Sequence, residues 1–308
     1  MNQTVTEAGV EPLARTAGVG RILILGHSGF IGSYLDRTYQ RKLPGVEIVG
    51  LSAPEFDLTR EQDAEKLADY LDPQTVVVFL AGVKRQLGDD LNAFTMNIRM
   101  AVNFCRVLER HPVKRLVFFS SAAVYGEENQ NTRIIEETPV HPTSFYGAAK
   151  YAAECLLEKV IRSQGQGSLL ILRPPLIYGP GDASNGYGPS GFVKAALDGE
   201  TITVWGDGSE RREFIFVGDV AEIVFALSLG TYNGVLNPAS GQSSTYTDIV
   251  NILSRTLGRQ VQTTSRLRSK NKVDHGYSNA TFMKLLPDFA FTPLEEGIRR
   301  TIDSKGSR

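Results

Sequence analysis

The stretch that decides the fold runs from residue 22 to residue 32 and reads Ile22-Leu23-Ile24-Leu25-Gly26-His27-Ser28-Gly29-Phe30-Ile31-Gly32. Its first four residues form an unbroken apolar run, which is typical of a short strand covered on both faces of a sheet. The glycines that follow predict a tight turn, and residues 30–41 continue with the apolar spacing of a helix. The first regular segment of the chain is therefore a strand, a glycine-rich turn and a helix.

The spacing of the three glycines predicts a site for a phosphate group. Gly26 permits the tight turn, Gly29 lets the backbone approach a pyrophosphate, and Gly32 lets the helix pack closely on the sheet. The free amide groups and the positive dipole at the start of the helix then attract the anion. Because a lone glycine triplet is a weak signal, its place directly after the first buried strand is what favours a dinucleotide site.

Short apolar runs and amphipathic stretches continue to alternate along the chain up to residue 172. The further strands expected are residues 46–51, 76–80, 116–119 and 169–172, and the further helices are residues 61–71, 92–110 and 146–163. Five repeats of this alternation predict an α/β fold with a Rossmann-type, doubly wound parallel sheet.

The alternation also predicts how the chain is divided. We expect residues 1–20 to form a flexible leader and residues 21–173 to form a dinucleotide-binding domain, with a return segment at about residues 214–238. Pro-rich and Gly-rich loops interrupt the pattern after Arg173. A smaller C-terminal α/β substrate lobe is therefore expected from residues 174–213 and 239–308.

The composition excludes several classes of protein. The 308 residues are 42% hydrophobic, and 33 Lys and Arg against 34 Asp and Glu give a net charge of −1. A nucleic-acid-binding protein would need a clear basic excess, and no apolar run approaches the roughly 18 residues that a membrane span needs. Cys105 and Cys155 lack the spacing of a disulfide scaffold or a zinc site, so we expect no metal and a reducing, cytoplasmic location.

Three polar residues form the expected catalytic group. Tyr146 and Lys150 are four residues apart and therefore share one face of a helix. An ammonium group beside a phenol favours the phenolate and brings its pKa down from about 10, so that Tyr146 can exchange a proton while hydride moves. Ser121 follows the fourth strand, at the edge where doubly wound sheets bind ligands, and its hydroxyl can hold a reacting carbonyl in line.

Together with the glycine turn, these residues make the chain resemble the extended short-chain dehydrogenase/reductase family, and within it the nucleotide-sugar epimerase/reductase branch. The resemblance covers about residues 21–303. Its other marks are Asp57-Leu58, Leu80-Ala81-Gly82, Asn97, the rest of Ser120 to Gly126, Arg173-Pro174, Tyr178-Gly179-Pro180 and the segment from Trp205 to Val220.

The resemblance implies roles for the matching residues. Tyr146 would be the acid/base, Lys150 would bind the nicotinamide ribose and tune Tyr146, and Ser121 would bond the reacting oxygen. Asp57-Leu58 would face the adenine, and Asn97 would support the active-site helix. The residues expected to bind NAD or NADP are Gly26, Ser28, Gly29, Phe30, Ile31, Gly32, Ser52, Asp57, Leu58, Leu80, Ala81, Gly82, Asn97, Tyr146, Lys150 and Pro174.

The substrate that the resemblance implies is a nucleotide-diphosphate sugar. Arg212 matches an arginine that pairs with the substrate diphosphate, a role that suits the fork of a guanidinium group. Lys84, Arg85 and Gln86 follow the third strand at the same sheet edge, where they are either solvated loop residues or contacts to phosphate or sugar hydroxyls. The expected substrate-binding residues are Lys84, Ser121, Ala122, Tyr146, Phe192 and Arg212.

Two alanines narrow the expected reaction. Sugar 4,6-dehydratases of the family carry an acidic pair at the positions of Ala122 and Ala123, and enzymes of the GDP-fucose synthase type carry a cysteine at Ala123. Since alanine cannot move a proton, hydride chemistry at carbon 4 of the sugar remains. We expect a 4-ketoreductase first and a 4-epimerase with tightly held NAD second; a non-catalytic nucleotide-binding sensor would lack Ser121, Tyr146 or Lys150, and all three are present.

Ser52 bears on the choice of cofactor. NAD-specific relatives end the second strand with an acidic residue on the adenosine ribose, whereas Ser52 stands there in this chain. Because no carboxylate would repel a 2′-phosphate, the position favours NADP over NAD. Exchange of NADP(H) in each turnover in turn suits a reductase.

A homodimer is the expected assembly. Family members commonly dimerise through a four-helix bundle, and residues 92–110 and 146–163 are the corresponding helices. The apolar side chains in these two segments would equally suit simple packing against the sheet.

Overall fold

A parallel β-sheet of six strands forms the centre of the molecule. The computed structural model describes residues 18–165, 167–183, 186–268 and 271–306, so most of the predicted leader at residues 1–20 lies outside the described residues. The strand order is β10-β6-β4-β3-β1-β2, and all neighbouring pairs are parallel. The strands are β1 (Arg21–Leu25), β2 (Glu47–Leu51), β3 (Thr75–Phe79), β4 (Arg115–Phe119), β6 (Ser168–Leu172) and β10 (Gly234–Leu236).

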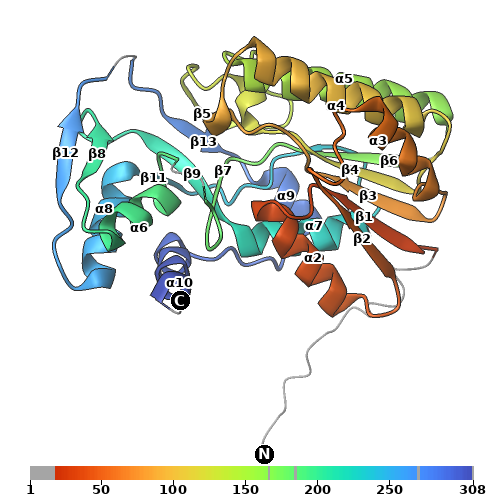
Figure 1. Cartoon of the computed structure of the whole chain (residues 1–308). Helices are drawn as coiled ribbons and strands as arrows, with labels where there is room; N and C mark the ends of the chain where they lie inside the picture. The colour runs from red at the N-terminus through yellow and green to blue at the C-terminus, as the bar shows by residue number, and fades with distance from the viewer. Residues whose placement is uncertain (1–17, 166, 184–185, 269–270, 307–308) are drawn as a thin grey trace, which may run out of the picture.

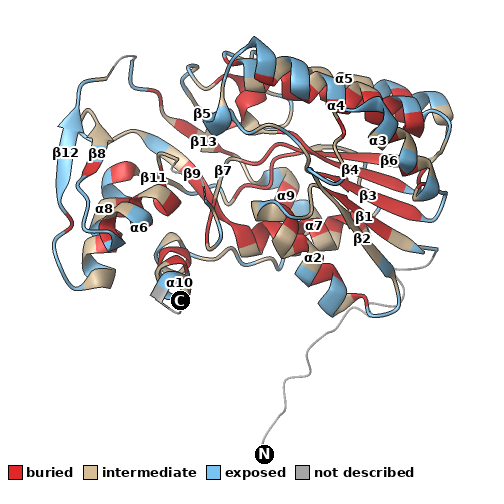
Figure 2. Ribbon diagram, viewed as in Figure 1, coloured by how far each residue is buried: buried red, intermediate tan, exposed pale blue. Residues whose placement is uncertain are grey.

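Helices cover both faces of this sheet (Figure 1). One face packs against α3 (Glu61–Glu65), the 3₁₀ helix η1 (Lys66–Asp69), α4 (Leu91–Leu108) and α5 (Phe145–Gln164). The other packs against α2 (Phe30–Lys42), α7 (Val217–Ser228) and α9 (Ala280–Leu285). Because both faces are covered, β3 and β4 are buried along their whole length (Figure 2). The predicted α/β fold with a doubly wound parallel sheet is confirmed.

Some element boundaries differ from the prediction. The helix expected at residues 61–71 is α3 followed by η1, although Leu67 and Leu71 are both buried as a helical pattern requires. The expected return segment at residues 214–238 starts inside β9 (Arg211–Phe216), which lies outside the six-stranded sheet. The segment then supplies α7 and the edge strand β10 to the large sheet.

Three small sheets complete the described part of the fold. β7 (Leu176–Tyr178), β9 and β11 (Ser243–Thr245) form one, β8 (Ile202–Trp205) and β12 (Thr263–Arg266) the second, and β5 (Asn131–Ile134) and β13 (His275–Tyr277) the third. The helices beside them are α6 (Pro189–Leu197), α8 (Tyr246–Leu257) and α10 (Leu294–Gly306). They share an apolar core in which Val193, Ile249 and Ile298 are fully buried. None of the helices in the described residues has the length and apolar character that crossing a bilayer requires.

Candidate active site

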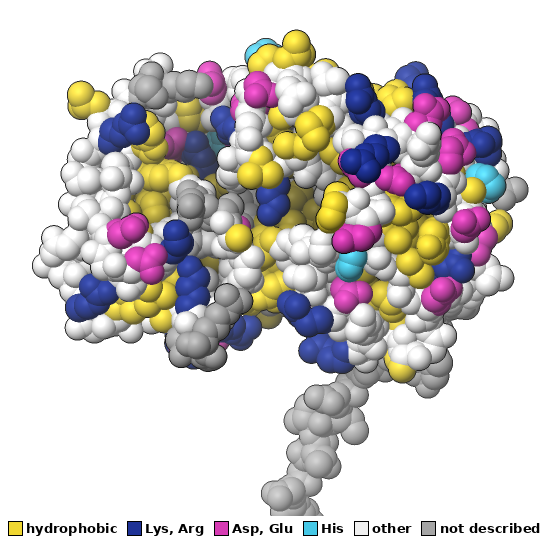
Figure 3. Space-filling view, in the orientation of Figure 1, with side chains coloured by type: hydrophobic (Ala, Val, Ile, Leu, Met, Phe, Trp, Pro, Cys, Tyr) yellow, Lys and Arg dark blue, Asp and Glu magenta, His cyan; other side chains and the backbone are white. Residues whose placement is uncertain are grey.

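A cavity of about 1270 Å³ opens where β1, β3, β4 and β6 end and extends to β8, β9 and β13. Because the strands of the large sheet are parallel, the residues that follow each of them meet at this edge. The space-filling view shows the molecule hollowed here, with apolar and basic side chains in the hollow (Figure 3). The carboxyl edge is thus where the structure brings distant segments of the chain together.

The glycine turn forms one end of this cavity. A Cβ atom on Gly32 would lie 2.2 Å from the carbonyl oxygen of Gly26, so only glycine lets α2 begin so close to the strand end. Gly26 has φ +94°, and a Cβ there would lie 2.9 Å from the amide nitrogen of Ala81. Gly29 is the N-cap residue of α2, so the first amide groups of the helix face the cavity.

Ten of the predicted cofactor-binding residues line the cavity, and six do not. Those that line it are Gly26, Gly29, Phe30, Ile31, Gly32, Leu80, Gly82, Tyr146, Lys150 and Pro174. Those that do not are Ser28, Ser52, Asp57, Leu58, Ala81 and Asn97.

Two of these six residues brace the glycine turn. The hydroxyl of Ser52 accepts a hydrogen bond from the amide of Ser28 at 3.1 Å and lies 2.9 Å from Nδ1 of His27. A Cβ atom on Gly50 would lie 2.4 Å from Cγ of His27, so the imidazole covers the end of β2. The residue after β2 is therefore occupied in holding the turn.

Asn97 and Leu58 support neighbouring loops from inside the fold. The amide side chain of Asn97 accepts from the backbone N–H of Val83 at 2.8 Å and donates to the carbonyl of Val83 at 3.1 Å. Asn97 was expected to support the active-site helix, but these two bonds hold the loop after β3. Leu58 is buried in the core, and its carbonyl accepts from the side chain of Asn103.

Ser121, Tyr146 and Lys150 all line the same cavity. Ser121 is the N-cap residue of the 3₁₀ helix η3 (Ala122–Tyr125) directly after β4. Tyr146 lies in the first turn of α5, where its backbone N–H donates to Asp89 at 2.9 Å. Lys150, one turn further on, is buried and donates from Nζ to the carbonyl of Phe119 at 2.7 Å. β4 and α5 thus place a hydroxyl, a phenol and an ammonium group together.

Burial controls the pKa values of Tyr146 and Lys150. Burial raises the pKa of Tyr146 to about 12, although a hydrogen bond with Ser121 acts in the opposite direction. Burial also lowers the pKa of Lys150 to about 8, against the effect of the charge of Glu154. Loss of solvation therefore sets the direction of both pKa shifts, and the lowering of the phenol pKa by Lys150 stays a prediction.

The predicted substrate-binding residues are divided between the wall and the core. Lys84, Ala122 and Arg212 line the cavity, with Nζ of Lys84 5.9 Å from the ring centre of Phe30. Phe192, which was expected to bind the substrate, does not line the cavity. It is 5% exposed and packs beneath Tyr187, because it belongs to the face of α6 that covers the apolar core.

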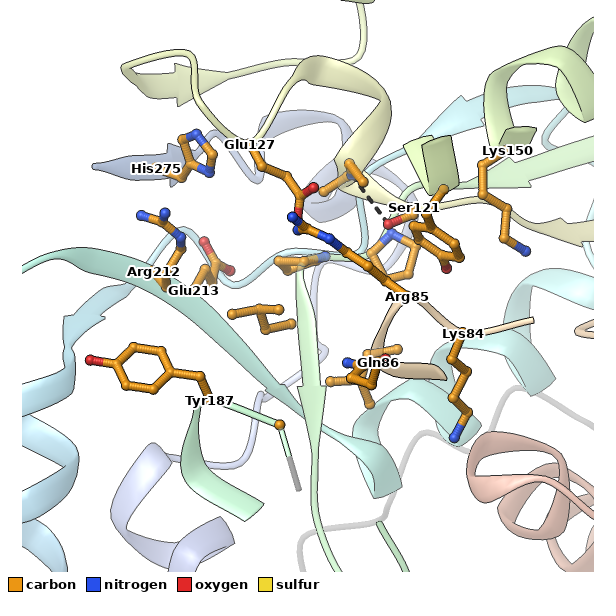
Figure 4. Close-up of a pocket in the computed structure, with 18 of the residues that line it drawn as sticks. Lys84, Arg85, Gln86, Ser121, Glu127, Lys150, Tyr187, Arg212, Glu213 and His275 are labelled. Carbon is orange, nitrogen blue, oxygen red and sulfur yellow. Dashed lines mark hydrogen bonds and ion pairs between the residues drawn. The ribbon is translucent and has the colours of Figure 1, made fainter. Parts of the chain in front are cut away.

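The wall contains further residues, of which Arg85 was expected at this edge and Arg268 was not. Arg85 forms an ion pair with Glu127 beside Ser121 (Figure 4). Arg268 and Glu210 lie in the wall with Arg212, and no motif marked Arg268, which follows β12 in a loop. Trp205 also lines the cavity, with the guanidinium of Arg266 4.6 Å from its ring centre. Trp205 and Glu210 both belong to the segment from Trp205 to Val220, which was one of the marks of the family resemblance.

The sequence profile of the NAD dependent epimerase/dehydratase family matches residues 22–235. The chain belongs to this family. The family match spans β1 to β10, and so includes the glycine turn, Ser121, Tyr146, Lys150 and Arg212.

Individual members of the family resemble the chain over most of its length. A putative UDP-glucose 4-epimerase of Methanocaldococcus jannaschii is 24% identical over 304 residues, which cover 92% of this chain and 97% of the relative. A GDP-L-fucose synthase of Sinorhizobium fredii is 24% identical, covering 77% of this chain and 80% of the relative. The solved UDP-glucose 4-epimerase of Thermus thermophilus in complex with NAD is 26% identical, with a TM-score of 0.81, 94% of this chain covered and 100% of that one.

Proposed function

We propose that this epimerase/dehydratase family member transfers hydride to and from carbon 4 of a nucleotide-diphosphate sugar. The observation that carries the proposal is the placement of Ser121, Tyr146 and Lys150 in one cavity with the glycine turn and Arg212. In this proposal, residues 21–173 with the return segment at about residues 214–238 would bind the cofactor, and residues 174–213 and 239–308 would bind the substrate.

The glycine turn fits the pyrophosphate of a nicotinamide dinucleotide. The space that a Cβ atom on Gly32 would fill leaves the start of α2 open to an anion. Phe30 and Ile31, the first two residues of that helix, lie at the cavity surface, where their backbone N–H groups would face the anion. Lys150 and Pro174 would hold the nicotinamide end. The bound cofactor would supply the acceptor and donor of hydride.

The three side chains then have separate tasks. Tyr146 would take the proton from the O4 hydroxyl when carbon 4 is oxidised, and return it when the ketone is reduced. Ser121, whose hydroxyl already interacts with the phenol, would orient the O4 atom. Lys150 is fixed by the carbonyl of Phe119, so its charge has a defined position opposite a phenolate. Burial raises the pKa of Tyr146, so a positive charge beside the phenolate would assist proton release, and Nζ of Lys150 lies 5.8 Å from the ring centre of Tyr146.

Of the two reactions at carbon 4, we place 4-epimerisation first. The relatives that match nearly the whole chain include 4-epimerases, and the solved one with 26% identity is a complex with NAD. Ser52, which favoured NADP and hence a reductase, uses its hydroxyl group in hydrogen bonds with the backbone of Ser28 and the ring of His27. A 4-ketoreductase is the second candidate, because the end of β2 still carries no carboxylate.

The test separates these two reactions. The purified protein is denatured and its extract analysed for released dinucleotide, and the protein is then assayed with UDP-glucose and with UDP-4-keto sugars plus NADPH. Released NAD together with formation of UDP-galactose supports the epimerase. Consumption of NADPH only with the 4-keto sugar supports the reductase. No hydride transfer with UDP-, GDP-, CDP- or dTDP-activated sugars would contradict both.

A further inference from the structure

A carboxylate lies between two arginines in the cavity wall, at the end away from the glycine turn. Oε1 of Glu210 lies 2.6 Å from Nη2 of Arg212, and its other oxygen lies 2.9 Å from Nη1 of Arg268. The three side chains are only 15%, 16% and 19% exposed. Each oxygen of Glu210 therefore serves one guanidinium group, and the pairs are largely shielded from solvent.

The same arrangement reduces the positive charge of this wall. Arg268 also pairs with Asp207 at 3.1 Å, so two carboxylates accompany two guanidinium groups. Arg212 makes further bonds to the backbone carbonyls of Arg211 and Val273. An arginine pair that binds a diphosphate would be strongest without a resident anion, since charges held in a shielded site act more strongly than charges in water.

We propose that Glu210 is an internal competitor for the anion site, which weakens binding of the substrate diphosphate and speeds release of the product. The inference rests on the proposed function, because a nucleoside diphosphate is the ligand that Arg212 and Arg268 would bind. A diphosphate that enters must share these guanidinium groups with the carboxylate or displace it. Glu210 thereby sets affinity at the nucleotide end of the cavity and takes no part in chemistry at Ser121 and Tyr146.

A merely structural role makes a different prediction. Glu210 also ties the loop after β12, through Arg268, to β9, through Arg212. If that were its whole function, loss of its charge would loosen the loop and weaken ligand binding. Glu210→Gln keeps the shape and one hydrogen-bond acceptor while removing the charge, and so separates the two roles.

The experiment is calorimetric titration of the holoenzyme and of E210Q with UDP, inorganic pyrophosphate and uridine at two salt concentrations. E210Q is expected to bind UDP and pyrophosphate about five- to tenfold more tightly, because a charge within a few ångströms of the ligand is removed. Its affinity should fall more steeply with salt. Uridine carries no phosphate, so its affinity should be the same in both proteins.

Glu61→Gln is the matched control, because Glu61 pairs with Arg106 on the surface, remote from the cavity wall. It should leave all three affinities unchanged. Equal or weaker binding of UDP and pyrophosphate by E210Q overturns the inference. Tighter binding of pyrophosphate with no binding of UDP by either protein upholds the anion competition and contradicts the proposed nucleotide-sugar substrate instead. Failure of both proteins to bind either anion contradicts the inference as well.

Discussion

At the scale of single residues, the proposed function gives the phenol of Tyr146 the role of acid/base. Tyr146→Phe removes the only proton-exchanging atom of that side chain and leaves its ring in place. We expect turnover to fall about 10²- to 10⁴-fold, the usual contribution of a general acid/base, with little change in cofactor affinity. Steady-state kinetics and cofactor titration measure the two effects.

Tyr151→Phe is the control for that variant. Tyr151 lies on the same helix but is 39% exposed and outside the cavity wall. It should retain full activity. Substantial turnover in Tyr146→Phe would remove Tyr146 from the acid/base role.

Glu213 predicts a dependence of stability on pH. It is 1% exposed, one of its oxygens accepts from the backbone and side chain of Ser240 and from the N–H of Gly241, and the other has no partner among the described residues. Burial raises its pKa from 4.5 to about 7. An acid whose pKa is raised by folding stabilises the fold below its ordinary pKa, and that contribution is lost as the pH rises through the folded value.

Glu213→Gln should therefore respond less to pH than the parent protein. Between pH 5 and pH 8 the parent loses up to about 3 kcal/mol of unfolding free energy through this group, and the variant does not. Urea unfolding at both pH values measures the difference. Identical pH dependence in the two proteins would show that Glu213 stays ionised in the fold.

The placement of Ser121, Tyr146 and Lys150 in one cavity could be predicted from the sequence. Ser121, Tyr146 and Lys150 follow from a strand end and a helical spacing of four, both of which are local features. Arg268 could not be predicted, because its loop reaches the wall only through packing of β12 on β8. The burial of Phe192 could not be predicted for a related reason, because its neighbours in sequence do not show which face of α6 packs against the core.

At the scale of elements, the junction of β1 and α2 depends on the absence of a side chain at Gly32. Gly32→Ala would bring a methyl group to 2.2 Å from the carbonyl of Gly26. The overlap can be relieved only by moving α2 away from the turn, at a cost of about 1–3 kcal/mol. We expect lower thermal stability and at least a tenfold loss of cofactor affinity, measured by thermal unfolding and dinucleotide titration.

Gly45→Ala provides the comparison. A Cβ atom on Gly45 would meet nothing within 4 Å. The variant should bind cofactor normally. Equal behaviour of the two variants would show that close packing of α2 is not required for binding.

The strands of the large sheet could be predicted because an unbroken apolar run as short as Val76 to Phe79 is typical of a strand buried on both faces. The residues at which helices end could not be predicted in the same way. The change from α3 to η1 alters the hydrogen bonds of the backbone but not which side chains are buried. The spacing of the buried residues Leu67 and Leu71 therefore does not reveal where the α-helix ends and the 3₁₀ helix begins.

At the scale of the whole molecule, α4 and α5 lie side by side along one face of the large sheet and make extensive contact with each other (Figure 1). Their buried side chains, such as Phe104 and Leu157, explain the packing on the sheet. Packing on the sheet does not account for the apolar side chains that the pair leaves in solvent. These are Leu91 at 65%, Met96 at 37%, Phe145 at 46% and Tyr151 at 39% exposed.

A second copy of the chain would cover these side chains, as the family resemblance implies. We expect the protein to be a dimer at micromolar concentration, and Met96→Asp to convert it to a monomer, because a charge buried in an apolar interface without a partner is strongly unfavourable. Light scattering measures the mass of both. Leu197→Asp is the matched control, since Leu197 on α6 has the same 37% exposure and lies on another part of the molecule. It should leave the dimer intact, whereas a monomeric parent protein, or a Met96→Asp variant that remains dimeric, would exclude the α4–α5 face as the interface.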